Sequence, residues 1–287
     1  MHLVFNRATK RTEEEKIYGA GSLNFVYNTK LGNLLSFLLL KRKFISKLVS
    51  LRYRSKASRK MIPGFVKQYG IDLKGAKPED FTSFNDFFTR KQERETEKNP
   101  ERFLSPADSR LLVHKIEKDT VLSVKGQSYS LPQLLQDEKL AAEFEGGLCM
   151  VFRLCPTDYH RYCFPADGDA GKTKIIKGAY DSVNTFFVPE SVHATNYREM
   201  TLLRTEQFGD VIFMEVGAML IGKVTPTFEC PGHFTAGQEK GVFEYGASTV
   251  ILVTKPGAVQ TDEDIMKCSE KGLETLVKYG EGIGTKA

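Results

Sequence analysis

Near its C-terminus the chain reads Phe243-Glu244-Tyr245-Gly246-Ala247-Ser248-Thr249-Val250 and continues as Ile251-Leu252-Val253. Aromatic and β-branched residues on both sides predict a β-strand, but the small pair Gly246-Ala247 interrupts them. Glycine weakens a strand interior unless the backbone has to bend or be approached closely. The interruption therefore has two interpretations. It is a β-bulge or tight hairpin, or it is a site where the Ser248 hydroxyl attacks the carbonyl carbon of Ala247 and the chain cuts itself.

The residues that precede this stretch have the pattern of a β protein. From about residue 103 onward, short runs of β-forming residues alternate with Gly, Pro and Asp, which predicts an antiparallel sheet in a sandwich-like or barrel-like arrangement. Two short helices are expected within it, at Leu131–Leu135 and Glu138–Phe144. The expected strands are Arg110–Ile116, Val121–Lys125, Cys149–Leu154, Ser182–Val188, Val211–Val216, Ala218–Val224 and Val250–Thr254.

The N-terminal part of the chain has a different pattern. Residues 13–70 carry apolar side chains at intervals of three and four, which predicts helices. A further helix is predicted over residues 83–92, with Ser83 as its N-cap and Asp86 at the third helical position. The fold class is therefore α+β. A helical, membrane-associating region is expected over residues 1–80, followed by an antiparallel catalytic body over residues 81–287.

Charge is distributed unevenly along the chain. Residues 1–70 hold 15 Lys and Arg against three Glu, a net charge of +12, although the whole chain carries only +5. This region contains the apolar stretch Leu31–Leu40, followed at once by Lys41-Arg42-Lys43. The stretch is too short to span a bilayer, and its position and flanks do not fit a signal peptide. It is either a basic amphipathic helix at a membrane surface or a core helix with a solvated basic face. Nucleic-acid binding ranks third, because no basic motif with interleaved aromatic residues is present.

Composition excludes several classes of protein. With 41% hydrophobic and 27% charged residues the chain is globular rather than disordered. Its five cysteines form no CxxC pair, so neither a disulfide framework nor a zinc ribbon is expected, and a reducing, cytosolic setting is the simplest inference. No metal site is expected, because no set of side chains has metal-ligand spacing and four histidines are scattered: His2, His114, His193 and His233.

Two other polar clusters lie on different predicted strands. Asp108 belongs to Ser105-Pro106-Ala107-Asp108, and His160 belongs to the polar run Pro156–Pro165. With Ser248 they supply an acid, an imidazole and a hydroxyl, which are the groups that nucleophilic catalysis needs. A conventional hydrolase receives little support, because the chain has no Gly-x-Ser-x-Gly motif.

With these motifs in place, the sequence resembles the phosphatidylserine decarboxylase proenzyme family. The resemblance covers roughly residues 80–255 in the family's order, which makes the bulge interpretation of the Ser248 stretch much weaker. It rests on Phe84-Asn85-Asp86-Phe87-Phe88-Thr89-Arg90, Ser105–Asp108, Val124–Leu131, Leu154–Pro165, Ser182-Val183-Asn184, Val216-Gly217-Ala218 and Glu239–Phe243 leading to Ser248.

The resemblance implies a pyruvoyl enzyme that makes its own cofactor. Ser248 would attack Ala247, with His160 as the base and Asp108 orienting that base. Elimination and loss of ammonia would then leave a pyruvoyl group, derived from Ser248, at the start of a small chain (residues 248–287) that stays with a large chain (residues 1–247). Through a Schiff base with this group, phosphatidylserine would lose CO₂ and become phosphatidylethanolamine, with His160 as the candidate proton donor. The implied setting is the cytoplasmic face of the cell membrane, with peripheral binding to anionic lipid, and a homodimer is compatible with it.

The chain departs from the family pattern at two positions. Many members have a second histidine where this chain has Cys163, so His160 would have to serve both self-cleavage and decarboxylation, or another group would help. Many also have Gly where this chain has Ala247, and Ala reaches a strained backbone geometry less easily. Two alternatives stay open: a decarboxylase of a different seryl lipid, and a lipid-binding relative that no longer cleaves itself.

Overall fold

The structure is a computed structural model, which describes residues 3–15, 29, 50–117, 121–124, 127–178, 196–217, 224–245 and 248–287. Several predictions lie outside these residues. They concern residues 16–28 and 30–49 of the predicted helical region, which include the apolar stretch Leu31–Leu40 and the basic residues after it. They also concern the predicted strand Ser182–Val188, all of Ala218–Val224 except Val224, and the cleavage-site residue Ala247.

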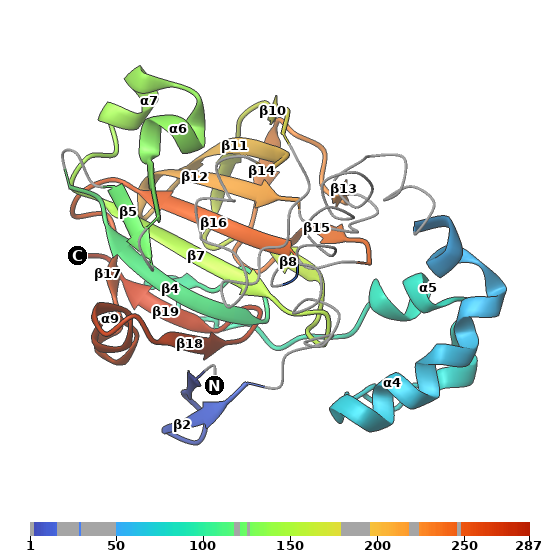
Figure 1. Ribbon diagram of the computed structural model, residues 1–287. Coiled ribbons are helices and arrows are strands. Elements are labelled where there is room, and N and C mark those ends of the chain that lie inside the picture. The colour runs from blue at the N-terminus through green and yellow to red at the C-terminus, as the bar shows by residue number, and fades with distance from the viewer. Residues whose placement is uncertain are drawn as a thin grey trace.

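An 11-stranded sheet forms the centre of the molecule (Figure 1). Its order is β14-β9-β11-β12-β16-β7-β4-β18-β1-β2, with β10 also paired to β11. Neighbouring strands are antiparallel except for β1 and β18, which run parallel. The strands span Leu3–Asn6 (β1), Arg11–Glu14 (β2), Ser109–Lys115 (β4), Leu148–Leu154 (β7), Gly168–Ala170 (β9), Lys174–Ile176 (β10), Arg198–Thr205 (β11), Gly209–Val216 (β12), Gly232–Phe234 (β14), Ser248–Thr254 (β16) and Glu274–Val277 (β18).

Smaller elements cover this sheet. Three-stranded sheets are formed by β13 (Val224–Pro226), β15 (Glu239–Phe243) and β8 (Arg161–Cys163), and by β17 (Gln260–Thr261), β19 (Gly282–Thr285) and β3 (Arg102–Leu104). A separate hairpin joins β5 (Val121–Val124) and β6 (Gln127–Ser130). The described helices are η2 (Lys56–Met61), α4 (Ile62–Tyr69), η3 (Pro78–Asp80), α5 (Phe84–Phe88), α6 (Leu131–Leu135), α7 (Glu138–Ala142) and α9 (Glu263–Glu270).

Strand β16 is buried on both faces, which explains its nearly continuous apolar sequence. Val250 and Leu252 pack with the side chains of the two small sheets. Ile251 and Val253 point the other way, into a second cluster that α6 and α7 cover. Because side chains alternate along a strand, Ser248 lies on the same face as Val250 and Leu252. The prediction of a strand here is confirmed, and the strand is a central one.

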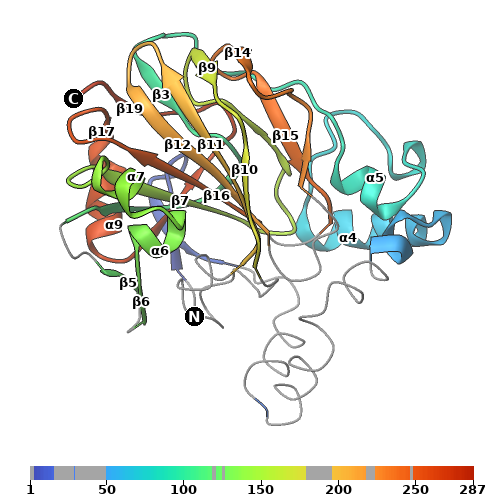
Figure 2. The same cartoon turned by 90° about the horizontal axis from the view of Figure 1, so that it is seen from above.

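Helices α4 and α5 lie at the opposite end of the sheets from α6 and α7 (Figures 1 and 2). Their aromatic side chains form a cluster of their own around Phe65, Phe84 and Phe87, joined by Tyr245 from the segment after β15. The predicted N-cap of α5 is confirmed, since Ser83 Oγ accepts a hydrogen bond from the Asp86 amide at 3.1 Å. The helix ends at Phe88 rather than at residue 92.

The residues after α5 leave the helix to contact a tyrosine. Gln92 donates its backbone N–H to the Tyr159 hydroxyl at 3.1 Å, and the Arg94 guanidinium lies 4.4 Å from the centroid of the same ring. The amides of Thr89 and Arg90 still bond back to α5, whereas the amide of Gln92 takes the tyrosine hydroxyl as its acceptor in place of a helical carbonyl. Local sequence pattern does not reveal such distant contacts.

The N-terminal region differs from the prediction. Residues 3–6 and 11–14 form a β-hairpin at the sheet edge, so a helical region that includes residues 13 and 14 is wrong at its start. Asn6 closes the turn because its Oδ1 accepts from the Ala8 amide at 3.0 Å. Residues 56–69 and 84–88 are helical, as expected.

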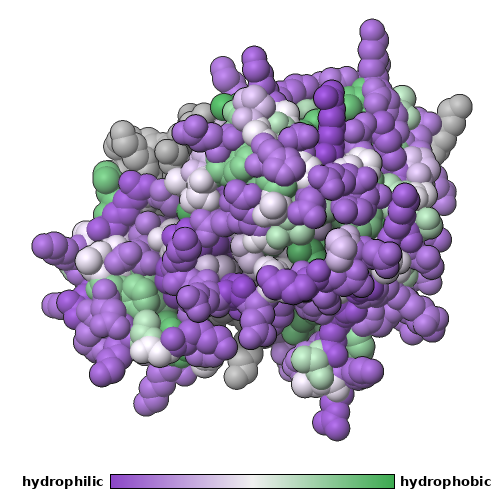
Figure 3. All heavy atoms as spheres, turned by 180° about the vertical axis from the view of Figure 1, so that it is seen from behind, coloured by the Kyte–Doolittle hydropathy of each residue, from purple (hydrophilic) through white to green (hydrophobic). Residues whose placement is uncertain are grey.

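The arrangement of the β body is also more specific than predicted. Antiparallel pairing is confirmed, but the described strands do not close into a barrel: the large sheet stays open, with β14 and β2 at its edges. Among the described residues, no helix has both the length and the apolar character needed to cross a membrane. Figure 3 shows that polar side chains cover most of the rear face, where apolar ones appear in small separate patches.

Candidate active site

Ser248 is the first residue of β16 and is fully buried. It is paired in register with Leu154, the last residue of β7. Its Oγ has no hydrogen-bond partner among the described residues. A buried hydroxyl without a partner is rare in a folded protein, because leaving it unpaired costs about 1–3 kcal/mol. Among the described residues, the hydroxyls of Thr254, Thr261 and Thr275 also lack a partner. Ser248 stands out because it is the residue that follows the predicted cleavage site.

His160 is brought to the same end of the sheets by β15. The amide of Phe243, at the end of β15, donates to the carbonyl oxygen of His160 at 2.9 Å. Phe243 and Ser248 lie on the two sides of the predicted cleavage site, which is between residues 247 and 248. The chain before the cleavage site is thus hydrogen-bonded to His160, and the chain after it begins the central strand β16.

The imidazole of His160 is held as a neutral base. Its Nδ1 lies 3.0 Å from the carbonyl oxygen of Asp158, and because a carbonyl only accepts, Nδ1 carries the proton. Its Nε2 therefore carries the free lone pair, and this atom is buried with no hydrogen-bond partner in the described part of the chain. Burial lowers the pKa of His160 to about 3, and the nearby charges of Arg90 and Arg110 act in the same direction. The ring is thus neutral at physiological pH.

Asp108 lies close enough to affect His160 by its charge, but its hydrogen bonds go elsewhere. Its Oδ1 accepts from the Tyr279 amide at 2.9 Å, and its Oδ2 accepts from Arg94 at 2.9 Å. The bond to Nδ1 that an orienting aspartate would make is made here by the Asp158 carbonyl. Asp108 favours the protonated imidazole through its charge alone.

The Phe84–Arg90 motif packs against the segment that leads to the cleavage site. Asn85 Oδ1 accepts a hydrogen bond from the Tyr245 amide at 3.1 Å. The Tyr245 ring lies 5.3 Å from that of Phe84 and 5.2 Å from that of Phe88. Helix α5 therefore holds the chain just before residues 246 and 247.

Cys163 is buried with Tyr159 and Tyr279. Its Sγ lies 3.7 Å from the carbonyl oxygen of Ser105, to which the thiol donates. Burial raises the pKa of Cys163 to about 12, so the group is a neutral thiol and a poor base.

A buried ion pair near Ser248 was missed by the sequence reasoning. Glu215 stands opposite Val250 in register, two residues along β16 from Ser248, and on the same face. Lys240, from β15, forms an ion pair with Glu215, and both side chains are buried. Burial raises the pKa of Glu215, and the charge of Lys240 opposes that rise. The available signal was an acidic residue inside the apolar run of β12.

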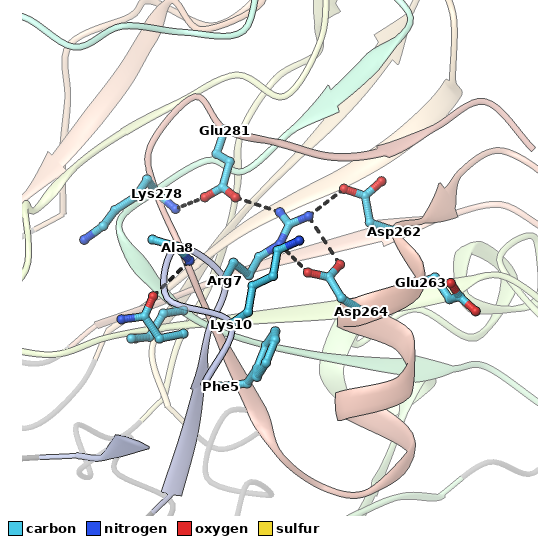
Figure 4. A pocket seen from close by; sticks show the side chains of 11 residues that line it. Phe5, Arg7, Ala8, Lys10, Asp262, Glu263, Asp264, Lys278 and Glu281 are labelled. Atoms are coloured by element: carbon cyan, nitrogen blue, oxygen red, sulfur yellow. Dashed lines mark hydrogen bonds and ion pairs between the residues drawn. The ribbon is translucent and has the colours of Figure 1, made fainter. Parts of the chain in front are cut away.

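A cavity of about 820 Å³ lies where the N-terminal hairpin meets the C-terminal segment (Figure 4). Arg7 reaches into it from the hairpin and forms ion pairs with Asp262 and Asp264 at 2.8 Å and with Glu281 at 2.7 Å. All three carboxylates belong to residues 248–287. Within the described ranges, no group of His, Cys, Asp and Glu is arranged to hold a metal ion.

Comparisons with known proteins agree on one family. A family model described as phosphatidylserine decarboxylase matches residues 82–285. The phosphatidylserine decarboxylase proenzyme 2 of Clostridium acetobutylicum is 40% identical over 289 residues, which cover 98% of this chain and 97% of that protein. The phosphatidylserine decarboxylase proenzyme of Ruminiclostridium cellulolyticum is 42% identical over 290 residues, covering 98% and 96%. That of Clostridium tetani is 41% identical over 290 residues, covering 98% and 97%. Similarity of this extent, together with the buried serine and histidine, shows that the chain belongs to the phosphatidylserine decarboxylase family.

Proposed function

We propose that this chain is a proenzyme that cuts itself between Ala247 and Ser248 and then decarboxylates phosphatidylserine to phosphatidylethanolamine. Its similarity to proteins named phosphatidylserine decarboxylase proenzymes, over nearly their whole length, supports the reaction and the substrate. Cys163 in place of a second histidine favours one rival, a lipid-binding relative that no longer cleaves itself. A decarboxylase of a different seryl lipid is the other rival.

The observation that carries the proposal is the pair of unpartnered polar atoms, Ser248 Oγ and His160 Nε2. Both are buried, and both lack a hydrogen-bond partner among the described residues. One is the nucleophile that the reaction needs, and the other is a lone pair that can accept its proton. Other buried polar atoms of the described residues also lack a partner, so the support for a reactive site comes from the combination of a hydroxyl with a free imidazole lone pair, at elements that flank the predicted cleavage site in the chain.

Self-cleavage follows from these groups. Ser248 Oγ attacks the carbonyl carbon of Ala247 while His160 Nε2 takes the hydroxyl proton. The peptide bond breaks, an ester forms between the Ala247 carbonyl and Ser248 Oγ, and the released amine of residue 248 takes up a proton. Removal of the Cα proton of residue 248 then expels the Ala247 carboxylate and leaves a carbon–carbon double bond. Addition of water and loss of ammonia leave a pyruvoyl group at the new chain start.

Position 248 suits a pyruvoyl group. The group keeps the three-carbon skeleton of Ser248, so it fits the same space. Strand β16 pairs with β7 along its whole length and with β12 from Thr249 onward, so the sheet would hold the new chain start in place. A pyruvoyl group held here would supply the electron-accepting ketone that decarboxylation of an amino acid headgroup needs.

His160 is suited to move protons in one order. Its pKa of about 3 keeps the ring neutral in the uncut chain, so it acts first as a base. It then holds the proton on Nε2 and returns it to the released amine. As a proton donor in decarboxylation it would have to receive a proton first.

We place the mature protein at the cytoplasmic face of the cell membrane, bound peripherally as a heterodimer of residues 1–247 and 248–287. The charge of +12 over residues 1–70 supports binding to an anionic surface. The apolar stretch Leu31–Leu40 supports burial at the level of the lipid headgroups. Phosphatidylserine is itself anionic, so the same surface would present the substrate.

Intact-mass spectrometry of the purified protein tests the proposal. The wild-type chain should appear as two pieces, with the smaller one starting at position 248 and blocked to Edman degradation. Ser248→Ala should give one intact chain, and Ser269→Ala, on helix α9, is a control that should still split. Splitting of Ser248→Ala at the same bond would refute the nucleophile, and an unsplit wild-type chain would favour the lipid-binding rival. Assay of the split protein with vesicles of phosphatidylserine separates its decarboxylation from that of another seryl lipid.

A further inference from the structure

The position of the His160 imidazole depends on a turn just before it. The Asp158 carbonyl oxygen accepts from Nδ1 at 3.0 Å, which leaves the lone pair on Nε2. The free imidazole side chain of histidine prefers the other tautomer, with the proton on Nε2. Whatever fixes the Asp158 carbonyl therefore keeps His160 in the form that can act as a base.

The turn is fixed by the Asp158 carboxylate. Its Oδ2 accepts from the Cys155 amide at 2.7 Å, and the Asp158 amide donates back to the Cys155 carbonyl oxygen at 2.9 Å. The same Oδ2 forms a short ion pair with Arg110 of β4. The carboxylate is only 12% exposed, so this ion pair is shielded from solvent and is stronger than a surface one.

Arg110 is held from its other side by Glu15. Arg110 Nε lies 2.5 Å from Glu15 Oε1, and the Glu15 side chain is 3% exposed. Glu15 also accepts from Arg153 at 2.8 Å and from the Cys155 thiol at 3.0 Å. Burial acts to raise the pKa of Glu15, but the charges of Arg153 and Arg110 outweigh it and lower the pKa, so the group is a carboxylate.

Removal of the Glu15 carboxylate would weaken the series of contacts that runs from Glu15 through Arg110 to the Asp158 turn. Arg153 would keep Glu274, which accepts from its Nε at 2.8 Å. Arg110 would keep only Asp158 among the carboxylates with which it forms ion pairs in the described structure. The guanidinium could then shift with the turn, because among the described residues no other carboxylate forms an ion pair with its Nε.

We propose that Glu15 is a positioning residue for His160, which acts through Arg110 and the Asp158 turn to keep the lone pair on Nε2. Glu15 directly follows β2 of the N-terminal hairpin. The first strands of the chain therefore help to keep His160, about 145 residues later, in the tautomer that acts as a base. The inference rests on the proposed function, in which His160 Nε2 is the base of self-cleavage.

The tautomer of His160 can be read directly by ¹⁵N NMR in the unprocessed Ser248→Ala chain, in which only five histidines contribute. In this background His160 should carry its proton on Nδ1 alone. Adding Glu15→Gln to this chain keeps the shape of the side chain and removes its charge. His160 should then populate the tautomer that is protonated on Nε2. Added Glu14→Gln, at the exposed neighbouring position, should leave the tautomer unchanged.

The splitting rate of the otherwise wild-type chain gives the second readout. Glu15→Gln should slow splitting roughly tenfold, a part of the 10²–10⁴-fold that a positioned base supplies, and Glu14→Gln should split at the normal rate. Asp158→Asn weakens the same series of contacts at the Asp158 turn and should shift the His160 tautomer in the same direction. The proposal can therefore be tested even if Glu15→Gln fails to fold.

The possible failures are distinguishable. Unchanged tautomer in both Glu15→Gln and Asp158→Asn, with normal splitting, would overturn the positioning role and leave the proposed function intact. A wild-type chain that never splits would refute the proposed function, whereas the tautomer measurement would still report whether Glu15 controls His160.

Discussion

The imidazole of His160 lies against the phenyl ring of Phe88, with 3.9 Å between the ring centroids. The same phenyl ring contacts Tyr245, whose amide is held by Asn85. One short helix thus covers the base and also fixes the backbone that leads to the cleavage site. The contact contributes to the burial of His160, which is 1% exposed, and this burial keeps the imidazole neutral.

Removal of the base should abolish self-cleavage. His160→Ala should leave the chain intact in a mass spectrum taken after prolonged incubation, because a serine hydroxyl without a base is a poor nucleophile at neutral pH. His233→Ala is the matched control, since the His233 side chain is 62% exposed. Splitting of His160→Ala at the wild-type rate would show that another group takes the proton.

The buried neutral His160 should make the folded chain sensitive to acid. In the unfolded chain its pKa is about 6.5, whereas in the folded chain burial lowers that pKa to about 3. The unfolded state therefore binds the proton first, and stability falls as the pH decreases from about 6.5 to about 3, by roughly 2 kcal/mol at pH 5.

Urea unfolding of Ser248→Ala at neutral pH and at about pH 5 measures this loss. Adding His160→Gln should reduce the difference between the two pH values by roughly 2 kcal/mol, whatever its effect on absolute stability. An unchanged difference would mean that His160 takes up a proton in the folded chain.

The hydrogen bond from Tyr245 to Asn85 should speed self-cleavage. Asn85→Ala removes the acceptor, which is worth about 1 kcal/mol, and should slow splitting roughly five- to tenfold in a time course by gel electrophoresis. Asn99→Ala also removes an acceptor of a backbone amide, that of Glu101 at 3.0 Å, but far along the surface, and should have no effect. Equal rates for the two variants would exclude a role for Asn85.

Cys163 should contribute little to the chemistry. Its thiol is neutral and bonded to the Ser105 carbonyl, so Cys163→Ala should change the splitting rate by less than about threefold, well below the effect of removing a catalytic base. A loss as severe as that of His160→Ala would show instead that the Cys163 thiol takes part in proton transfer.

The basic residues after the apolar stretch should govern membrane binding. Lys41, Arg42 and Lys43 changed together to Glu should weaken flotation with anionic vesicles, since each basic residue contributes roughly 1 kcal/mol at such a surface. Turnover of vesicle-embedded lipid should fall, while self-cleavage should continue. Undiminished flotation of the triple variant, before and after high salt, would contradict peripheral electrostatic docking.

Sequence pattern was most informative where structure is local. The Ser83 cap of α5 and the apolar run of β16 each lie within a few neighbouring residues, and both were predicted. The hairpin at residues 3–14 was not, because Arg11, Glu13 and Glu14 are charged and β1 pairs with β18, some 270 residues away. The local periodicity of the sequence gives no signal for strand pairing between residues so far apart in the chain.

Only part of the candidate site could be predicted from the sequence. Ser248 and His160 belong to family motifs, so the resemblance pointed to them. The partner of the His160 ring is a backbone carbonyl, and every residue carries one, so side-chain identity gave no signal for it. Glu15 lies outside the matched motifs, and its ion pairs with Arg110 of β4 and Arg153 of β7 join residues 95 and 138 positions apart in the chain.

The central place of β16 makes maturation a one-way event. Residues 248–287 contribute β16 between β12 and β7, β18 between β4 and β1, and β19 beside β3, and Arg7 binds them by three ion pairs. All of this is assembled while the chain is continuous, when each closure is intramolecular. After the cut, refolding from the denatured state becomes a bimolecular search for a strand that belongs in the middle of the sheet. We therefore expect the processed protein, unlike the uncut Ser248→Ala chain, to recover poorly from denaturant and to recover better as its concentration rises.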